Sequence, residues 1–392
     1  MKTQYPVQWA AGLASTLFPY LIKQDPKKII LTSFHCDGYR GNTRLIFEEL
    51  CKHSDFKPVW LSRNQDLINS LKKNFGENRA ELAHSIDGLK SLASASALLF
   101  THGTSDYPFL RLPSRSLRIQ TYHGLPTKRG EYLRPNSEKP PGFFHKLILK
   151  YRFQPINYFL SSSPFVTEVF SQRFNLSKES FIECGYPSYD PLINANTDDG
   201  FIQTIYPDAP EYKSVVLYSP TYRKLSKTKW FPFDDFDQRE LGEFLETNKI
   251  LLLLRPHPNE DFDFHTYGNI SERILYAGDN IIEDAYQILI HTNVIITDYS
   301  SIYLEGLLRN IPSIFIPYDL DNYERGFPYP YDEFTPGEKV NSMEGFFYSL
   351  NSAIKNKDYY ADERVKIRDL FFSRVDGKST ERVIRFLENQ LL

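Results

Sequence analysis

Short apolar runs alternate with amphipathic segments through the first half of the chain. The amphipathic segments, such as residues 43–53 and 166–174, carry apolar side chains at helical spacing and are predicted as helices. The apolar runs are predicted as strands at residues 28–34, 57–61, 97–101, 117–122, 157–161 and 181–184. This alternation predicts βαβ units that build a parallel sheet.

The second half of the chain repeats the alternation. Strands are predicted at residues 214–219, 249–254, 274–276, 294–297 and 313–316, and helices at 343–356, 362–372 and 380–391. Residues 194–213 are polar, contain Asp198-Asp199-Gly200 and two prolines, and are predicted as a linker. We therefore expect an α/β protein with two Rossmann-like domains that face each other across a cleft. The expected domains are residues 1–200 and 201–375, with residues 376–392 as a C-terminal helix that can cross back to the N-terminal domain.

Two segments depart from this alternation. Residues 128–150 are basic and are predicted as irregular, with loop signals at Pro135, Pro140, Pro141 and Gly142. Residues 7–22 are apolar-rich, but Pro19 interrupts them, and the stretch is too short and too polar to span a bilayer. We expect a helix there that lies on the domain or on a membrane surface.

Composition narrows the classes of function. The 392 residues exceed what one hydrophobic core usually supports, which favours two domains. The net charge of −3, from 46 basic and 49 acidic side chains, gives no reason to expect a nucleic-acid partner. Three cysteines, Cys36, Cys51 and Cys184, are too few and too scattered for a disulfide framework or a zinc site, and they suit a reducing cytoplasm.

Two further patterns bear on the ligand. Aromatic residues make up 15% of the chain, which fits either large cores or a surface for sugars, nucleobases or lipid, and both interpretations stay open. The first predicted strand is followed by no G-x-G-x-x-G fingerprint. This absence argues against an oxidoreductase that uses NAD.

One strand ends in hydroxyl groups at the start of a helix. The predicted strand 294–297 closes on Thr297, and Asp298, Ser300 and Ser301 then stand before the helical residues 302–308. We expect these side chains to cap that helix. Unpaired N–H groups and the helix dipole would make its start an anion site, although capping alone is also common.

Two more strands in the same half end in cationic side chains. Thr221 and Arg223 follow residues 214–219, and Arg255 and His257 follow residues 249–254. A guanidinium at a strand tip suits phosphate oxygens, and Pro256 and Pro258 would present His257 rigidly. A surface salt bridge and a passenger histidine are the structural alternatives. Because parallel sheets bind ligands at the carboxyl ends of their strands, three such tips suggest a nucleotide-diphosphate site.

His123 is the candidate catalytic base. It follows the strand-like residues 117–122, and Gly124 and Pro126 then turn the chain, which would leave the imidazole at a strand tip. A neutral imidazole can accept the proton of a hydroxyl nucleophile. The nearby Lys128 and Arg129 favour a functional role, whereas a histidine bonded to a loop carbonyl is the structural alternative.

An acidic, tyrosine-containing loop and two histidines complete the candidates. Asp319, Asp321, Tyr323 and Glu324 lie in one loop without metal-ligand spacing, and either a solvated loop or a polyol site would account for them. His35 and His102 also follow predicted strands, and their membership of the site stays open.

Together the motifs resemble the CDP-glycerol glycerophosphotransferase family, the teichoic acid primases and polymerases and related capsule enzymes. The resemblance covers residues 28–385. Its pieces are Tyr122-His-Gly-Leu-Pro126, Gly185-Tyr-Pro187, Ser219-Pro-Thr-Tyr-Arg223, Arg255-Pro-His-Pro258, Thr297-Asp-Tyr-Ser-Ser301, the run from Pro317-Tyr-Asp319 through Tyr323 to Arg325-Gly-Phe327, and Asp376-Gly377 with Arg382. Each piece is weak alone, but their number and order are specific.

The resemblance implies a GT-B fold and transfer of a polyol phosphate from a CDP-polyol, with release of CMP. His123 matches the family's base, His257 its second essential histidine, and Ser300 and Ser301 its donor-phosphate contacts. Tyr122 replaces the family's usual tryptophan and Leu125 its usual threonine, which leaves acceptor details open.

We therefore expect a phosphotransferase that acts on CDP-glycerol or another CDP-polyol and on a hydroxyl of a lipid-linked teichoic-acid-like or capsular acceptor. The expected catalytic residues are His123 and His257. The expected donor-binding residues are Thr221, Arg223, Arg255, Thr297, Asp298, Ser300 and Ser301, and the expected acceptor or polyol residues are Lys128, Asp319 and Tyr323. No cofactor or metal site is expected, and the sequence leaves dependence on a divalent metal open. The expected location is the cytoplasmic face of the cell membrane. The rivals are a GT-B transferase or epimerase acting on another nucleotide sugar, and a binding protein without activity.

Overall fold

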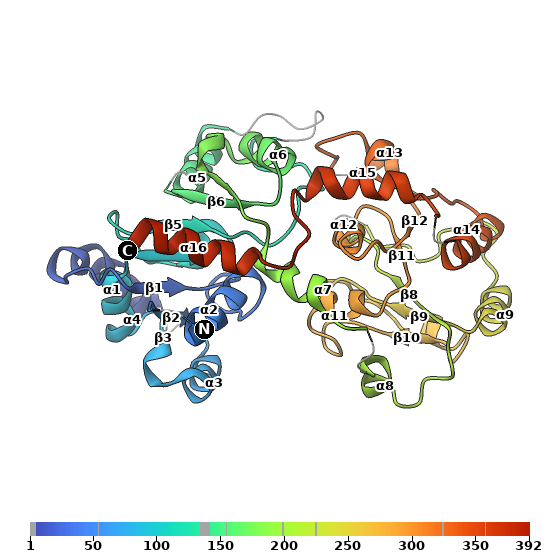
Figure 1. Ribbon diagram of the computed structural model, residues 1–392, viewed down its shortest axis with the longest axis horizontal. Coiled ribbons are helices and arrows are strands. Elements are labelled where there is room, and N and C mark those ends of the chain that lie inside the picture. Colours follow the sequence, from blue (N-terminus) through green and yellow to red (C-terminus); the bar gives the residue numbers. More distant parts are fainter. Residues whose placement is uncertain are drawn as a thin grey trace. The chain divides into compact units, whose positions relative to one another are not determined.

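The chain forms two compact units. The computed structural model describes residues 5–53, 55–133, 142–153, 155–197, 200–223, 226–323, 325–356 and 358–392. Unit 1 consists of Met1–Gly124, Gly130–Asp190 and Asp376–Leu392, and unit 2 of Leu125–Arg129 and Pro191–Val375 (Figure 1). The C-terminal residues 376–392 thus belong to unit 1 together with the N-terminal half.

Unit 1 is built on a seven-stranded parallel sheet. Its strands are β1 Lys28–Leu31, β2 Lys57–Ser62, β3 Ala80–Leu82, β4 Ala97–Phe100, β5 Leu117–Gln120, β6 Tyr158–Ser161 and β7 Phe181–Glu183. The strand order is β3-β2-β1-β4-β5-β6-β7, and every pairing is parallel. Every residue of β4 is buried, as expected for a parallel sheet covered on both faces. The apolar pattern predicted six of these strands and missed β3, which is only three residues long and contains Glu81.

Helices surround this sheet (Figure 1). They are α1 Tyr5–Leu21, α2 Gly41–His53, α3 Gln65–Phe75, α4 Ile86–Ser94, α5 Phe143–Phe153, α6 Pro164–Phe174 and α16 Ser379–Leu391, with short 3₁₀ turns η1 Glu77–Arg79, η2 Gly103–Asp106, η3 Lys178–Ser180 and η4 Pro187–Tyr189. The prediction that residues 128–150 are irregular is wrong for residues 143–150, which belong to α5. No proline interrupts this segment, and the four-residue spacing of Leu149 and Phe153 places both in the protein interior. Pro135, Pro140 and Pro141 lie outside the described residues.

Unit 2 is built on a five-stranded parallel sheet. Its strands are β8 Ser214–Tyr218, β9 Ile250–Leu254, β10 Ile274–Tyr276, β11 Val294–Thr297 and β12 Ser313–Phe315, in the order β10-β9-β8-β11-β12. All five were predicted. Its helices are α8 Phe201–Ile205, α9 Gln238–Asn248, α10 His265–Gly268, α11 Ala285–Ile290, α12 Ile302–Leu307, α13 Tyr331–Phe334, α14 Met343–Lys355 and α15 Ala361–Phe371, with α7 Asp190–Asn194 at the unit boundary and the 3₁₀ turn η5 Leu320–Asn322.

The segment predicted as a linker, residues 194–213, is part of unit 2. It contains α8, and the hydroxyl of Tyr206 donates a hydrogen bond to the carbonyl of Tyr276 at 2.7 Å. Polar composition suggested a connection, but a few apolar residues are enough to pack this segment on unit 2. Ile202, for example, is 2% exposed. Asp198 and Asp199 lie outside the described residues.

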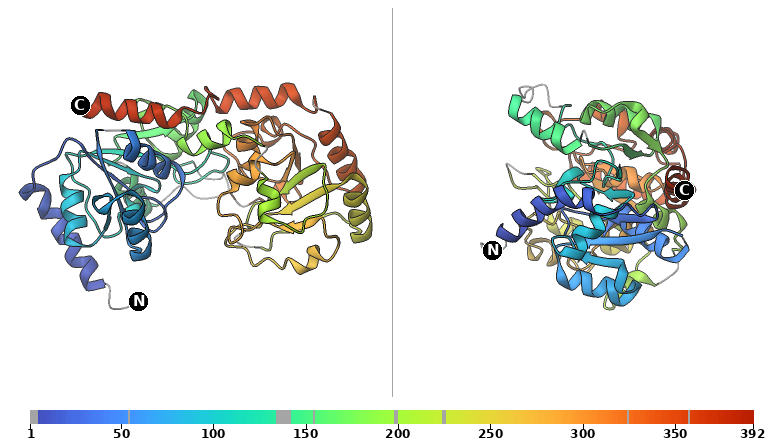
Figure 2. Two further views of the ribbon diagram at one scale, coloured as in Figure 1. Left: turned by 60° about the horizontal axis from the view of Figure 1, so that its bottom comes forward. Right: turned by 90° about the vertical axis from the view of Figure 1, so that its left-hand side faces the viewer.

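The C-terminal helix α16 returns to unit 1, where it lies along the body of that unit (Figure 2). The carboxylate of Asp190 accepts hydrogen bonds from the backbone N–H groups of Ser379 and Thr380, which start the helix. Gly185 has φ +81°, and a side chain there would begin 2.5 Å from the hydroxyl of Ser379. The Gly185-Tyr-Pro187 motif and the Asp376–Arg382 region, far apart in sequence, therefore meet in one contact.

Both sheets reverse their strand order at one point. In unit 1 the reversal lies between β1 and β4, and in unit 2 between β8 and β11. Ligands of open parallel sheets bind beyond the carboxyl ends of the strands at such a switch point. The loops after β1 and β4, and those after β8 and β11, are therefore the places to look for function.

Candidate functional site

Three histidines gather beyond the carboxyl ends of β1, β4 and β5 in unit 1. The ring of His102 lies parallel to that of His123, with 4.1 Å between centroids and 5° between planes. The ring of His35 lies 4.7 Å from that of His102. The sequence left the membership of His35 and His102 open, and the adjacency of β1, β4 and β5 brings both to the same place as His123.

The backbone around these histidines is unusual. Phe34, His35 and Cys36 are three consecutive residues with φ between 47° and 68°, and Tyr122, directly before His123, has φ 57°. Non-glycine residues in this left-handed region cost free energy and persist only where the surroundings impose them, often at functional sites. The side chain of Asn42 helps to impose the turn, because its Nδ2 donates to the carbonyls of Thr121 and Tyr122.

The environment keeps His123 neutral. Its side chain is exposed, yet neighbouring groups desolvate the ring, and this desolvation lowers the pKa of His123 from its ordinary value, with a further lowering from His102. Desolvation likewise lowers the pKa of His102, to about 3. A general base must be unprotonated before it acts, so a lowered pKa suits that task at neutral pH.

In unit 2 the three predicted strand tips lie next to one another. The strands β9, β8 and β11 are adjacent in the sheet, with Tyr218 of β8 paired to Leu254 on one side and Ile296 on the other. The sequence predicted three tips with phosphate-binding chemistry but could not say that they are neighbours.

The guanidinium of Arg223 bonds to other groups of the protein. It is 4% exposed, its Nε and Nη2 donate to the carboxylate of Asp319 at 2.8 Å, and Nη2 also donates to Asp298 at 2.8 Å. Its Nη1 donates to the carbonyl of Thr221. The rings of Tyr299, Tyr318 and Tyr323 surround the guanidinium at 4.9 to 5.3 Å. The bond pattern is that of a buried ion pair rather than of a guanidinium extended toward a ligand.

The expectation that Asp298, Ser300 and Ser301 cap α12 is wrong. Ser301 occupies the N-cap position with helical backbone angles, and its side chain makes no capping hydrogen bond. Asp298, 1% exposed, instead accepts from the backbone N–H of Thr221 at 2.7 Å and so ties β11 to the neighbouring tip of β8. Asp298 therefore bonds to a neighbouring strand tip instead of capping the helix that follows it. Thr297 is also committed, since its hydroxyl donates to the carbonyl of Ser219.

Arg255 and His257 have different surroundings although only Pro256 separates them. Arg255 is 9% exposed, and its Nη1 donates to the carbonyls of Ala277 and Ile282, which fixes the loop after β10. His257 is exposed, with its ring stacked at 5.2 Å on that of Tyr222. Partial desolvation lowers the pKa of His257, and the ammonium of Lys128 lowers it further.

The remaining predicted residues also fall in unit 2. Lys128 belongs to the segment Leu125–Arg129, in which Arg129 donates to the carbonyl of Phe327. Asp319 is half-buried and paired with Arg223, and the ring of Tyr323 lies 4.3 Å from that of Tyr299. Glu324 lies outside the described residues.

Ser300, Ser301 and Thr221 offer hydroxyls at this edge. Both serines are half-buried. Among the described residues, the buried Oγ1 of Thr221 has no hydrogen-bond partner. An unsatisfied buried polar atom calls for an explanation, and a ligand is one of them.

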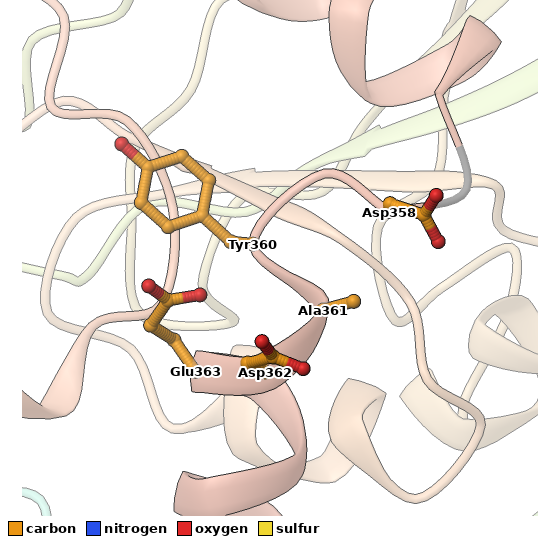
Figure 3. A pocket seen from close by; sticks show the side chains of 5 residues that line it. All are labelled: Asp358, Tyr360, Ala361, Asp362 and Glu363. Atoms are coloured by element: carbon orange, nitrogen blue, oxygen red, sulfur yellow. The ribbon is translucent and has the colours of Figure 1, made fainter.

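A separate pocket on unit 2 is unsuited to an anionic donor. It has a volume of about 410 Å³ and is lined by Asp358, Tyr360, Ala361, Asp362 and Glu363 (Figure 3). Three of its five lining side chains are carboxylates, which would repel a diphosphate.

Sequence reasoning missed several residues that shape the site. Asp106 is fully buried beneath the histidines, Arg40 lies 4.0 Å over the ring of Phe34, and Tyr222 stacks on His257. A signal for Asp106 was its position four residues after His102, in a loop that directly follows a buried strand. No local pattern marked Arg40.

Comparison with known proteins identifies the family. The model of the family described as CDP-glycerol:poly(glycerophosphate) glycerophosphotransferase matches residues 16–389. The teichoic acid glycerol-phosphate transferase of Staphylococcus aureus (strain NCTC 8325 / PS 47) is 27% identical over 390 residues, covering 94% of this chain and 95% of the relative. The teichoic acid poly(glycerol phosphate) polymerase of Bacillus subtilis (strain 168) is 27% identical over 91% of this chain, which spans 48% of that relative.

Solved structures agree on the fold. The wall teichoic acid polymerase TagF has a TM-score of 0.77 and 24% identity, with 97% of this chain and 94% of that chain covered. A histidine-to-asparagine variant of TagF soaked with CDPG has a TM-score of 0.75. The expected α/β fold of the GT-B type, with two parallel-sheet domains, is thereby confirmed. This chain is a transferase that belongs to the CDP-glycerol:poly(glycerophosphate) glycerophosphotransferase family.

Proposed function

We propose that this protein transfers glycerol phosphate, or a related polyol phosphate, from a CDP-polyol to a hydroxyl of a lipid-linked teichoic-acid-like or capsular acceptor and releases CMP. The observation that carries the proposal is the family match over residues 16–389, combined with an exposed, neutral histidine at the strand tips of unit 1. In the reaction a hydroxyl oxygen forms a bond to the β-phosphorus, the bond from that phosphorus to the bridging oxygen breaks, and CMP leaves.

His123 is the proposed general base. Its imidazole is exposed, so a hydroxyl can reach it, and its lowered pKa keeps it unprotonated. It takes the proton of the acceptor hydroxyl as the new phosphate ester forms. Phosphoryl transfer depends mainly on positioning and charge stabilisation, and proton removal adds a further factor.

The proposed donor site lies on unit 2, at the tips of β8, β9 and β11. We divide the predicted residues by their surroundings. Ser300, Ser301, Thr221 and His257 have hydroxyl or imidazole groups for the diphosphate. Among the buried residues, Arg223, Thr297 and Asp298 tie the tips of β8 and β11 together, and Arg255 fixes the loop after β10. They support donor binding without needing to contact the donor.

Lys128, Asp319 and Tyr323 are the proposed acceptor or polyol residues. Lys128 adds positive charge near His257: desolvation is the main cause of the lowered pKa of that histidine, and the Lys128 ammonium lowers it further. Such a charge suits the phosphate of either substrate. Asp319 is already paired with Arg223, so its contribution to a polyol would come from a carboxylate oxygen that also accepts from the guanidinium.

The proposed location is the cytoplasmic surface of the cell membrane, where a lipid-linked acceptor would lie. Helix α5 has an exposed apolar stripe beside basic residues: Phe143, Phe144, Leu147, Ile148 and Tyr151 are 47% to 80% exposed, and Lys146 and Lys150 are exposed among them. In α1, Leu13, Leu17 and Leu21 are 61% to 78% exposed, whereas Ser15 packs inward and accepts from the N–H of Arg111. The side chain of Trp9, in the same helix, lies outside the described residues.

Such surfaces bind anionic bilayers by apolar insertion and charge attraction. Within the part of the chain that the structure describes, no helix is long and apolar enough to cross a membrane. The test is co-sedimentation with phosphatidylglycerol vesicles, using phosphatidylcholine vesicles as the control. Replacement of Phe143 and Phe144 by serine should reduce binding, and salt should weaken it. If the wild-type protein and the variant with serine at positions 143 and 144 are recovered equally from the supernatant at low salt, membrane association is contradicted.

Product mass spectrometry tests the transferase proposal. The protein is incubated with CDP-glycerol, with CDP-ribitol and with a UDP-sugar, each in the presence of a synthetic glycerol-phosphate-primed lipid. We expect CMP release and acceptor elongation with a CDP-polyol, and turnover lower by about 10²-fold or more for His123→Ala. Turnover with the UDP-sugar alone would overturn the proposal.

Donor binding is tested separately by calorimetry with CDP-glycerol and CMP. Replacement of both Ser300 and Ser301 by alanine should weaken CDP-glycerol more than CMP, because the lost contacts serve the diphosphate. Equal weakening of both ligands would place the two serines away from the diphosphate.

A further inference from the structure

The parallel stack of His102 on His123 leaves the ring edges available while fixing the ring plane. The centroids are 4.1 Å apart and the planes differ by 5°. His102 is half-buried and His123 exposed, so the inner ring can support the outer one. A base is effective only if its lone pair is held toward the proton it takes, and a stack orients a ring without occupying either nitrogen.

His102 is itself anchored to a buried carboxylate. Its Nδ1 lies 2.7 Å from the hydroxyl oxygen of Thr101, and that hydroxyl donates to Asp106 at 2.9 Å. Because the hydroxyl donates its proton to Asp106, it accepts from His102, which therefore carries its own proton on Nδ1. Asp106 also accepts from the backbone N–H groups of Thr101, His102 and His35.

The turn that carries His102 is fixed from the other side as well. Nε2 of Gln120 donates to the carbonyl of Thr101 at 2.6 Å, and its Oε1 accepts from the N–H of Gly103 at 2.9 Å. Gly103 has φ +64°, and a side chain there would begin 2.8 Å from the carbonyl oxygen of Arg152. The His102 ring thus stands on a turn with little freedom to move.

Among the described residues, the His123 ring has no comparable hydrogen-bonded anchor, although the ring of Tyr122 also lies 4.2 Å from it. Its Nδ1 lies 3.5 Å from the carbonyl oxygen of Thr101, at the limit of a hydrogen bond. We propose that His102 is a positioning residue that holds the plane of the His123 imidazole through the ring stack, with Thr101 and Asp106 as its anchor. This inference rests on the proposed role of His123 as the base.

The charges around the stack disfavour protonation of both histidine rings at the same time. His123 faces His102, Asp106 and Arg173, and His102 faces His35, Arg40, Arg152 and Asp106. Desolvation is the largest cause of the lowered pKa of both rings, and each cation near His102 adds to it. His102 therefore stays neutral when its partner takes a proton, and loss of its ring should raise the pKa of His123.

Two substitutions separate the stack from the hydrogen bond. His102→Phe keeps a planar ring but has no nitrogen for Thr101, whereas His102→Asn keeps a donor near Nδ1 but has no ring. We expect His102→Asn to lower kcat by about tenfold or more with little change in the KM for CDP-glycerol. We expect His102→Phe to stay much closer to the wild-type kcat. Histidine ¹³Cε1 NMR should show a raised pKa for His123 in His102→Asn, a shift that a loss of stability alone would not cause.

His84→Asn is the matched control. His84 is a half-buried histidine of the same unit, hydrogen-bonded to the carbonyl of Pro108. It should leave both kcat and the pKa of His123 unchanged. In a His123→Ala background, His102→Asn should lower kcat no further, because the effect of His102 on turnover acts through His123.

The outcomes separate the two proposals. If His123→Ala retains normal turnover, the role of His123 as the base is wrong. If His123→Ala loses turnover but His102→Asn matches the wild type, or if folded His102→Phe loses as much as His102→Asn, the positioning role of His102 is overturned. Should His102→Asn fail to fold, His102→Phe still decides, because near-wild-type turnover supports the stack and a large loss in a folded protein refutes it.

Discussion

Replacing Arg223 by methionine should destabilise unit 2 far more than losing a surface ion pair would. Methionine can fill much of the aliphatic volume but supplies none of the donors. Asp298, 1% exposed, would lose its charge partner, and Asp319 would lose two hydrogen bonds. Removing one member of a buried ion pair costs roughly 3–5 kcal/mol, because the other charge stays buried and uncompensated.

The matched control is Arg239→Met. Arg239 pairs with Glu243 at 3.9 Å on the surface of α9, with both side chains at least 70% exposed. Pairs of this kind contribute roughly 0.3–0.5 kcal/mol. The two substitutions are chemically identical, so the difference between them isolates burial.

Hydrogen exchange followed by mass spectrometry is the assay, because it reports each unit separately. Amides of β8 and β11, which the Arg223 cluster joins, should open more easily by about 3–5 kcal/mol, or roughly 10² to 10³-fold and more in exchange rate. Amides of β1 and β4 in unit 1 should exchange as in the wild type. The double variant Arg223→Met/Asp298→Asn should recover part of the loss, since it removes the uncompensated charge.

The effect should depend on pH in a defined direction. Desolvation raises the pKa of Asp319, but the hydrogen bonds and charge of Arg223 outweigh it and hold that pKa below its ordinary value. A carboxyl group with a lowered folded-state pKa stabilises the fold above its unfolded pKa, about 3.9, and loses that contribution as pH falls through the folded value. The difference in stability between the wild type and Arg223→Met should thus have its full size near pH 7 and should become smaller below about pH 4.

A different result would indicate that Arg223 binds the donor. If Arg223→Met exchanged like Arg239→Met in β8 and β11 while CDP-glycerol affinity collapsed, the guanidinium would serve the donor and the buried-pair reasoning would be wrong.

Further predictions concern the histidines and two structural contacts. Because the pKa values of His123 and His257 are lowered, the acid limb of kcat/KM should lie below the ordinary histidine value of about 6.5, and a limb above it would contradict both shifts. Gly185→Ala should destabilise by roughly 1–3 kcal/mol, seen as faster exchange in α16, because φ is +81° and the new methyl group would clash with Ser379. Arg255→Met should speed exchange in residues 277–283 and leave β12 unchanged, since the guanidinium holds that loop.

Local pattern was enough for most of the fold. Apolar runs and helical spacing predicted all five strands of unit 2 and six of seven in unit 1, because a strand buried on both faces needs a nearly continuous apolar sequence. The pattern missed β3, which is short and carries a charge, and it missed α5 because neighbouring prolines and basic residues suggested a loop. Short or exposed elements leave a weak apolar signal, so their structure depends on what packs against them.

The sequence also determined which chemistry the strand tips carry. His123, His257, Arg223 and Ser300 with Ser301 each follow a predicted strand, and the order of the motifs pointed to the family that comparison then established. A residue that directly follows a parallel strand lies at the carboxyl end of that strand. Its placement at the carboxyl edge of the sheet therefore follows from the strand assignment alone.

Only the tertiary structure decided which of those residues meet and which are buried. Strand order is a long-range property, and it made β1, β4 and β5 neighbours and so stacked His102 on His123. Burial is equally non-local: it paired Arg223 with Asp298 and left His257 exposed. Sequence reveals the functional groups that are present, whereas their partners come from other strands, and the partners set each group's charge state, orientation and access to a ligand.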